Sequence, residues 1–424
     1  MKAGMHTGIF CRNKPLYLIS QPSPDHLMGL TRKSVMNPNR CVGSQTPGLN
    51  FPSQPFKEAT MGKVYLGVDF HSSKIVTHRI ERRADEKILR TNGSFFPENL
   101  SSFIRTLDLY TYVCVEASSG VFEFCEKIRP YVKEVIVIHP IGFRRMYLSG
   151  KKTDRVDAKN LADRLKAHIE DDDSKDDFPS VWIPPAAIRE LREMFSCLQL
   201  LKTQINRQKN KIRSMLRLHL SFQTRDIDVE IMNVDEFELP ETARWMIKQL
   251  QGLLCSTLIV KKQLEERIRR AAIMYDESTV KLLVTIYGVR ILGASALLAD
   301  AGAIDRFKTA KKFCRYMRSA PRVDSSNETT KIGNIDKAGR KTAFGYLVEG
   351  LLNIYAGNPN YTKFYQTKCI GKSKGKVRAA LVRKTLTAIF YIWKNREEYR
   401  FKHDLPTLRK IKEVERIKKL FRAA

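Results

Sequence analysis

The sequence predicts an α/β domain followed by an all-α helical arm and a mainly α C-terminal domain. Three observations support this fold class. From residue 61 to about residue 169, short apolar runs alternate with amphipathic segments. Over residues 188–278, apolar side chains recur at a spacing near 3.5, with lysine and arginine on the other face. Beyond residue 279 the chain is first rich in alanine and leucine and then strongly basic.

Residues 1–60 are the least organised part of the sequence. They hold seven of the 17 prolines and show no sustained period of either 2 or 3.6. Such a segment buries too little apolar surface to offset its ordering entropy. We expect either a disordered extension or a start placed too early, with Met61 as the natural first residue.

Residues 61–169 are predicted to form a mixed sheet covered by helices, because three strands precede a strand–helix–strand–helix series. The third strand, Lys87 to Arg90, is expected to be short. The other predicted strands span Val64 to Phe70, Lys74 to Ile80, Tyr112 to Glu116 and Glu134 to Ile138, and the predicted helices span Glu98 to Leu107, Val121 to Ile128 and Asp154 to Ile169.

An acidic linker is expected over residues 170–187, where the run EDDDSKDD precedes Pro184 and Pro185. Residues 188–278 then predict an antiparallel helical hairpin or a coiled-coil arm. Two ordinary bundle helices fit the same pattern, since neither run sustains four clean heptads. We assign residues 279–400 to the C-terminal domain and residues 401–424 to a basic tail.

Two features of the C-terminal part are typical of nucleic-acid contact. The turn Ile286-Tyr287-Gly288-Val289 precedes an Ala/Leu-rich helix and resembles half of a helix-hairpin-helix grip on DNA phosphate, although Arg290 replaces the usual second glycine. Residues 371–424 carry 17 lysines and arginines against five acidic residues, and a solvated face of an amphipathic helix is the alternative interpretation. The candidate contacts are Lys372, Lys374, Lys376 and Arg378, interleaved further on with Phe390, Tyr391, Trp393, Tyr399 and Phe401.

Composition narrows the class of protein. The 424 residues suit two or three domains, and 75 Lys plus Arg against 45 Asp plus Glu give a net charge of +30, which points to a polyanionic partner. The eight cysteines form no CxxC pair, which argues against a zinc ribbon and a disulfide-stapled secreted fold. The sequence has no apolar run of about 18 residues and no signal-peptide pattern, so we expect a cytoplasmic protein with no membrane partner.

Four carboxylates could hold metal. Asp69 and Glu116 each end a predicted strand, and Asp154 and Asp157 share one face of a helix at its first turn. Singly, these residues fit turn and cap roles, with Thr153 as a helix cap. Together, four carboxylates at one sheet edge would repel one another unless cations lay between them. Two Mg²⁺ ions, about 4 Å apart, would balance the charge and clamp the oxygens of a phosphoryl displacement.

Three motifs, GVDFHSSK, VCVEASSG and KKTDRVDAKNLA, resemble in order and spacing the DEDD (RuvC-like, ribonuclease-H-fold) domain of insertion-sequence transposases grouped with the Piv and MooV DNA invertases. Downstream, FKTAKKFCRYMRSAPRVDSSNETTKIGNIDKAGRK is similar to that family's C-terminal transposase domain. The resemblance covers most of residues 62–400. It implies that Asp69, Glu116, Asp154 and Asp157 are the metal-binding tetrad. It also implies DNA as partner, a homo-oligomer (dimer or tetramer), and the guide non-coding RNA used by one branch of the family.

The resemblance also implies a nucleophilic serine in the C-terminal domain, after a Pro-Arg-like pair and before a basic, glycine-containing turn. Matching Pro321-Arg322 and Gly333 to that pattern gives Ser326, with Ser325 as the neighbouring candidate. Asn327 stands where the family usually has glycine, and asparagine also tolerates a left-handed backbone. The basic residues expected to neutralise the phosphate are Lys331, Lys337, Arg340 and Lys341.

The first interpretation is therefore a DNA transposase or site-specific recombinase that cuts and rejoins DNA through a Mg²⁺ site and a serine nucleophile. The second is a RuvC-like structure-specific nuclease, similar to a junction resolvase, that uses metal-activated water. The third is an inactive nucleic-acid-binding relic. Mg²⁺-dependent cleavage separates the third interpretation from the others, and a covalent protein–DNA adduct separates the first from the second.

Overall fold

The computed structural model describes residues 62–82, 87–144, 153–171, 178–220, 227–326, 329–336 and 338–422. The expected disordered extension, residues 1–60, lies outside these ranges. Within them, no helix is both long enough and apolar enough to cross a membrane.

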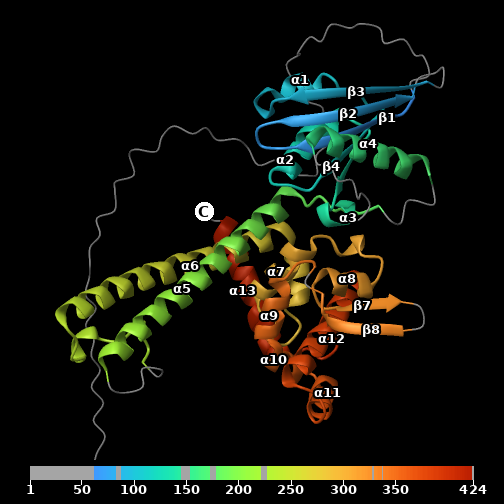
Figure 1. The fold of residues 1–424 in the computed structure, drawn as a ribbon. Helices are drawn as coiled ribbons and strands as arrows, with labels where there is room; N and C mark the ends of the chain where they lie inside the picture. Colours follow the sequence, from blue (N-terminus) through green and yellow to red (C-terminus); the bar gives the residue numbers. More distant parts are fainter. Residues whose placement is uncertain are drawn as a thin grey trace, which may run out of the picture. The chain divides into compact units, whose positions relative to one another are not determined.

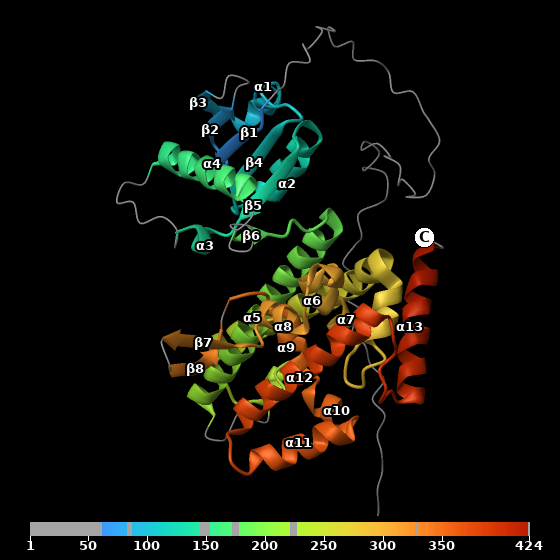
Figure 2. The ribbon, with the colours of Figure 1, turned by 90° about the vertical axis from the view of Figure 1, so that its right-hand side faces the viewer.

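A six-stranded mixed sheet organises the N-terminal part of the described chain, with strand order β3-β2-β1-β4-β5-β6 (Figures 1 and 2). The central strands β1, β4 and β5 run parallel, while β2, β3 and β6 are antiparallel to their neighbours. The strands are β1 (Val64–Phe70), β2 (Ile75–Arg82), β3 (Ile88–Phe95), β4 (Thr111–Glu116), β5 (Glu134–Ile138) and β6 (Ser180–Val181). The predicted mixed sheet is confirmed.

Two strands differ from the sequence prediction. β3 runs on to Phe95 instead of ending at Arg90, and it is an edge strand whose side chains are mostly exposed and polar. β6 lies inside the segment expected to be only an acidic linker, where it pairs with Val137 and Ile138 of β5. Neither strand carries the buried apolar run from which a strand is predicted.

Helices cover both faces of this sheet (Figure 2). α4 (Asp154–Glu170) packs on one face, and α1 (Leu100–Ile104) and α2 (Val121–Ile128) pack on the other. Adjacent β1 residues enter different cores: Tyr65 packs under α4 and Leu66 under α2, as the two-residue period of a strand requires. The predicted helix from Glu98 is shorter than expected. The short elements here are η2 (Pro97–Asn99), η3 (Arg129–Tyr131) and α3 (Pro140–Arg144).

Two long helices, α5 (Ala186–His219) and α6 (Glu241–Leu283), lie side by side (Figure 1). η4 (Val234–Glu236) lies in the connection between them. The end of α5 and the start of α6 share a hydrophobic core of their own. The start of α5 and the end of α6 belong to the core of the C-terminal helices. Inside α6, Asp276 has a non-helical backbone and accepts a hydrogen bond from the Thr279 amide at 2.9 Å, so it caps the last turns.

The C-terminal part is mainly helical with one two-stranded hairpin, β7–β8. Residues 401–424, expected as a basic tail, include a helix, α13, whose Val414 and Ile417 are buried in the main core; Lys281 of α6 forms an ion pair with Glu415 at 2.9 Å. The elements are α7 (Ile291–Ala301), η5 (Ile304–Arg306), α8 (Ala310–Tyr316), β7 (Pro321–Ser326), β8 (Thr329–Ile335), α9 (Thr342–Glu349), α10 (Leu351–Ala356), α11 (Pro359–Cys369), α12 (Lys374–Asn395) and α13 (Asp404–Arg422).

Candidate metal centre and serine hairpin

The carboxyl ends of two neighbouring parallel strands bring Asp69 and Glu116 to the same edge of the sheet. β1 and β4 pair in register through Val68 and Val115, and each acidic residue comes next along its strand. The Asp69 side chain is only 14% exposed. Burial, and the negative charges of Asp154 and Asp157, raise the pKa of Asp69 above its ordinary value, while nearby His71 lowers it.

The first turn of α4 supplies the other two predicted carboxylates. Thr153 caps the helix as expected, since its side chain accepts a hydrogen bond from the Val156 amide at 3.3 Å. Asp154 and Asp157 follow in the first turn, where the helix dipole favours negative charge. The negative charges of Asp154 and Asp157 help to raise the pKa of Asp69, so the start of α4 lies close enough to the end of β1 for these carboxylates to repel one another.

Gly67 allows α4 to approach β1 this closely. A Cβ atom added at Gly67 would lie 2.0 Å from the carbonyl oxygen of Ala158, 2.5 Å from the amide nitrogen of Ala162 and 2.9 Å from Cβ of Leu161. Any larger residue would push the helix off the strand. The glycine of the GVDF motif therefore fixes the distance between Asp69 and the acidic turn of α4.

The structure adds a residue that the sequence prediction missed. Ligand atoms of Asp69, His71 and Asp154 all lie within 4.8 Å of one another, and His71 Nε2 is 3.2 Å from Asp69 Oδ1. Glu116 lies at the same sheet edge by register, outside this group of three. The only sequence signal for His71 is its place two residues after Asp69 in GVDFHSSK.

The chemistry of this donor set fits a divalent cation. Two carboxylates and an imidazole are ligands that Mg²⁺, Mn²⁺ and Zn²⁺ accept to different degrees. Burial is the main cause of the raised pKa of Asp69, and the charges of Asp154 and Asp157 add to it; a bound cation would favour the charged carboxylate. As a direct ligand, histidine would favour a transition metal, whereas the carboxylates alone suit Mg²⁺.

The predicted serines lie at the end of a strand. Ser325 and Ser326 are the last residues of β7 and pair with Thr330 and Thr329 of β8. Ser326 is therefore the last described residue before β8, and Asn327 lies outside the described residues. Gly333 was expected in a turn, but it lies within β8.

A buried carboxylate holds the segment that follows this hairpin. Asp300, at the end of α7, has no exposed surface and accepts hydrogen bonds from Arg340 Nε at 3.1 Å and from the Ala343 amide at 2.8 Å. The Arg340 amide donates to the Tyr316 carbonyl at 2.8 Å, and Gly339 has a φ of 99°. Arg340, predicted to contact phosphate, thus has one guanidinium nitrogen engaged within the protein.

The predicted basic contacts fall into two groups. Lys341, Lys372, Lys374, Lys376 and Arg378 are exposed, whereas the side chain of Lys331 and the whole of Lys337 lie outside the described residues. The neighbouring helix α8 adds three exposed cations that the sequence prediction did not single out. They are Lys311, Lys312 and Arg315.

The aromatic part of that prediction was wrong. Phe390, Trp393 and Tyr399 are 2%, 2% and 7% exposed and belong to the main hydrophobic core. Among the interleaved aromatic residues, Tyr391 is exposed, at 54%. Three of the five side chains therefore stabilise the domain and are not available to stack on bases.

Comparisons with known proteins find transposase domains in two parts of the chain. A family model described as a transposase of the IS116/IS110/IS902 family matches residues 280–366, which include the β7–β8 hairpin. A second model, for the DEDD transposase domain of IS110, matches residues 116–220. That match includes Glu116, Asp154 and Asp157 and begins after Asp69 and His71.

Two relatives carry transposase names. A probable family 20 transposase of Pseudomonas aeruginosa is 22% identical over 255 residues, covering 56% of this chain and 69% of the relative. The putative transposase y4qE of Sinorhizobium fredii is 25% identical over 245 residues, covering 57% of each chain. The resemblance seen in the sequence motifs is confirmed: the two family models and the named relatives support a DEDD transposase of the IS110/IS116 type.

Proposed function

We propose that this transposase cuts and rejoins DNA with a metal site in a RuvC-like, ribonuclease-H-type domain and a serine nucleophile in the β7–β8 hairpin. The observation that carries the proposal is the grouping of Asp69, His71 and Asp154 within 4.8 Å at the end of a parallel strand. Carboxylates at such an edge suit phosphoryl transfer, and the net charge of +30 suits a nucleic-acid substrate.

Two Mg²⁺ ions are the proposed cofactor, and when bound they would stabilise charge on the attacking and leaving oxygens of a phosphodiester. Asp69 and Asp154 are proposed to hold them through carboxylate oxygens, with Glu116 and Asp157 completing the set. His71 is proposed to orient Asp69 through the contact between Nε2 and Oδ1.

Ser326 is the proposed nucleophile. Its Oγ would form a bond to phosphorus while the bond from phosphorus to a sugar oxygen breaks; the serine loses its proton and the departing oxygen takes one up. The energy of the phosphodiester is kept in the serine–phosphate link, so the reverse attack rejoins DNA. If water attacked instead, the same metal site would act as a resolvase-like nuclease.

The proposed partners follow from charge and resemblance. Exposed cations at the start of α12 and on α8 support contact with DNA backbone. A guide non-coding RNA and a dimeric or tetrameric assembly are proposed on the family resemblance alone.

The test compares strand cleavage by five variants on labelled DNA with and without Mg²⁺. Asp69→Asn, Glu116→Gln, Asp154→Asn and Asp157→Asn should each abolish cleavage and leave DNA binding largely intact, because each removes a metal ligand and relieves negative repulsion. The matched control is Asp163→Asn on the same helix, whose carboxylate pairs with Arg90 at 2.7 Å. Full activity in any of the four variants would remove that residue from the metal site.

A further inference from the structure

The helix α8 ends in a cap that usually contains glycine. The Ser319 amide donates a hydrogen bond to the Cys314 carbonyl at 2.9 Å, and the Arg318 amide donates to the Arg315 carbonyl at 3.0 Å, which is the bonding pattern of a Schellman cap. The cap requires a left-handed backbone, and Arg318 adopts it with a φ of 53°. Glycine is the usual residue at this position, because a Cβ atom makes the left-handed conformation unfavourable.

A second arginine with the same backbone conformation shows how a side chain can justify it. Arg396, after α12, is the other described non-glycine residue with a positive φ, at 58°. Its Nη1 donates a hydrogen bond to Thr279 Oγ1 at 2.8 Å, so the side chain ties the end of α12 to α6. Among the described residues, none forms a hydrogen bond or an ion pair with the Arg318 guanidinium. The strain at Arg318 therefore points to a partner outside the chain.

Arg318 belongs to a row of cations along one side of α8. Lys311, Arg315 and Arg318 follow one another at intervals of four and three, which places them on one face. The opposite face, with Phe313 and Met317, is buried in the main core. No acidic residue occurs between positions 305 and 324. We call the cations of this segment the basic stripe; its members are Lys308, Lys311, Lys312, Arg315 and Arg318.

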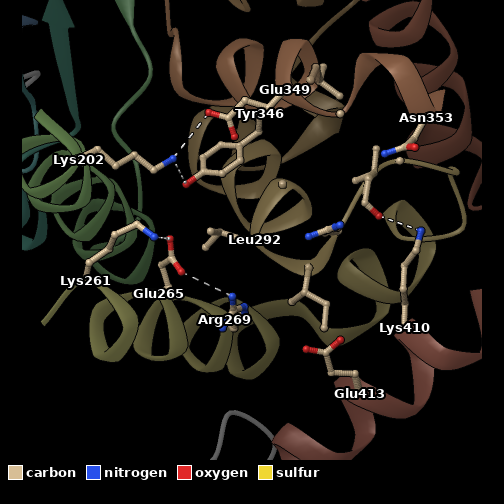
Figure 3. A pocket seen from close by; sticks show the side chains of 17 residues that line it. Lys202, Lys261, Glu265, Arg269, Leu292, Tyr346, Glu349, Asn353, Lys410 and Glu413 are labelled. Carbon is tan, nitrogen blue, oxygen red and sulfur yellow. Dashed lines mark hydrogen bonds and ion pairs between the residues drawn. The ribbon is translucent and has the colours of Figure 1, made fainter. Parts of the chain in front are cut away.

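Other basic side chains of the helical part already have acidic partners. Lys202 lies 3.8 Å from Glu349, and Lys261 lies 3.1 Å from Glu265, which also approaches Arg269 at 3.9 Å (Figure 3). Cations that are paired in this way have little charge left for a ligand.

The basic stripe is largely unneutralised. Within the described ranges it has one ion pair, between Arg315 Nη2 and Asp336 Oδ2 at 3.9 Å. The Arg315 side chain remains 76% exposed, and exposed pairs of this kind contribute little. The stripe, roughly 15 Å long at the rise of a helix, therefore offers a continuous positive surface to a polyanion.

The stripe lies beside the open end of the serine hairpin. Arg318 is three residues before Pro321, where β7 begins, and β7 ends at Ser326. The Asp336 amide, just after β8, donates to the Ala320 carbonyl at 2.9 Å and joins both ends of the hairpin next to α8. A nucleic-acid backbone that follows the stripe would thus pass the domain that carries the proposed nucleophile.

We propose that Arg318 binds a phosphate of double-stranded DNA and that the basic stripe guides the DNA backbone towards the serine hairpin. The proposal rests on the proposed function, in which DNA is the substrate, and adds a binding residue to it. The left-handed backbone of Arg318 lowers the stability of the fold, and its guanidinium gains a charged partner when DNA is bound. A contact to the backbone holds the duplex in place without reading its sequence.

The experiment measures the affinity of the full chain for a labelled DNA duplex at several salt concentrations, together with the melting temperature. Arg318→Gly should weaken binding on the order of tenfold and reduce the salt slope by about one, because one phosphate contact is lost. The same variant should melt at the temperature of the unmodified chain or above it, since glycine adopts the left-handed conformation without strain. Arg318→Lys keeps the charge and should keep the salt slope.

Arg396→Gly is the matched control, because it removes the same charge from the same backbone conformation. It should leave the salt slope unchanged, and an equal reduction in both variants would show an effect of net charge and overturn the contact. An unchanged slope in Arg318→Gly, or a clear fall in its melting temperature, would also overturn it and leave the proposed function standing. A loss confined to an RNA duplex of the same sequence would overturn the assignment to DNA. No DNA binding by the unmodified chain would contradict both proposals.

Discussion

Replacing Gly67 with alanine tests how the candidate metal site is built. The new Cβ would lie 2.0 Å from the Ala158 carbonyl oxygen, and ordinary contact begins at 3.4 Å, so α4 must withdraw by about 1.4 Å. Overpacking of this kind costs about 1–3 kcal/mol of unfolding free energy. The same shift moves Asp154 away from Asp69, and a displacement of about 1 Å in a catalytic site can reduce the rate roughly 10²-fold.

The assay pairs urea denaturation with metal-dependent strand cleavage. Gly252→Ala is the control, because Gly252 lies in α6 with nothing within 4 Å of an added Cβ. That variant should keep full cleavage and gain up to about 1 kcal/mol, since alanine is the better helix former. Unchanged stability and cleavage in Gly67→Ala would refute the claim that contact with this glycine sets the position of α4.

Three further outcomes are expected. Asp300→Ala should lower the free energy of unfolding by about 1–3 kcal/mol in urea denaturation, because Arg340 and the Ala343 amide lose a buried acceptor; a loss below 0.5 kcal/mol (roughly the level of a surface change) would contradict this. Burial, and then the charge of Arg290, lower the pKa of Lys410 to about 8, so its charged form is disfavoured in the fold. Between about pH 8 and the ordinary lysine pKa, Lys410 is protonated in the unfolded chain and largely neutral in the folded one, so the melting temperature should rise with pH. Lys410→Met should lose this pH dependence. An unchanged pH dependence in that variant would show that Lys410 is not its source. Replacing Lys374, Lys376 and Arg378 together by alanine should reduce the salt slope of DNA binding by up to about three, and an unaltered slope would remove this surface from the interface.

The strands of the sheet were predictable where they are buried. β1, β4 and β5 are the parallel central strands, and their apolar runs gave bounds that agree with the structure to within one residue. β3 was predicted too short because it is a polar edge strand. β6 was missed because a strand of two residues is too short to show an alternation of apolar and polar side chains. The hydrophobic pattern of a segment thus indicates whether its side chains are buried, and it does not indicate which strands pair with each other.

The candidate site was predicted in part. Spacing was enough to single out Asp69 and Asp154, because strand ends and first helical turns have characteristic positions. His71 was not predictable, since its approach to Asp69 depends on how the chain turns after β1. In α12 the error has a clear cause. Val382, Leu386 and Trp393 lie at helical spacing on one buried face, and Phe390 belongs to the same face.

A covalent link between the chain and DNA tests the central claim most directly. The unmodified chain is incubated with labelled DNA and Mg²⁺, denatured, and examined for label that migrates with the protein. The account predicts an adduct that Ser326→Ala abolishes and Ser325→Ala retains, because alanine offers no oxygen to carry the phosphate. Cleavage by the unmodified chain without any adduct would make water the attacker and contradict the serine mechanism.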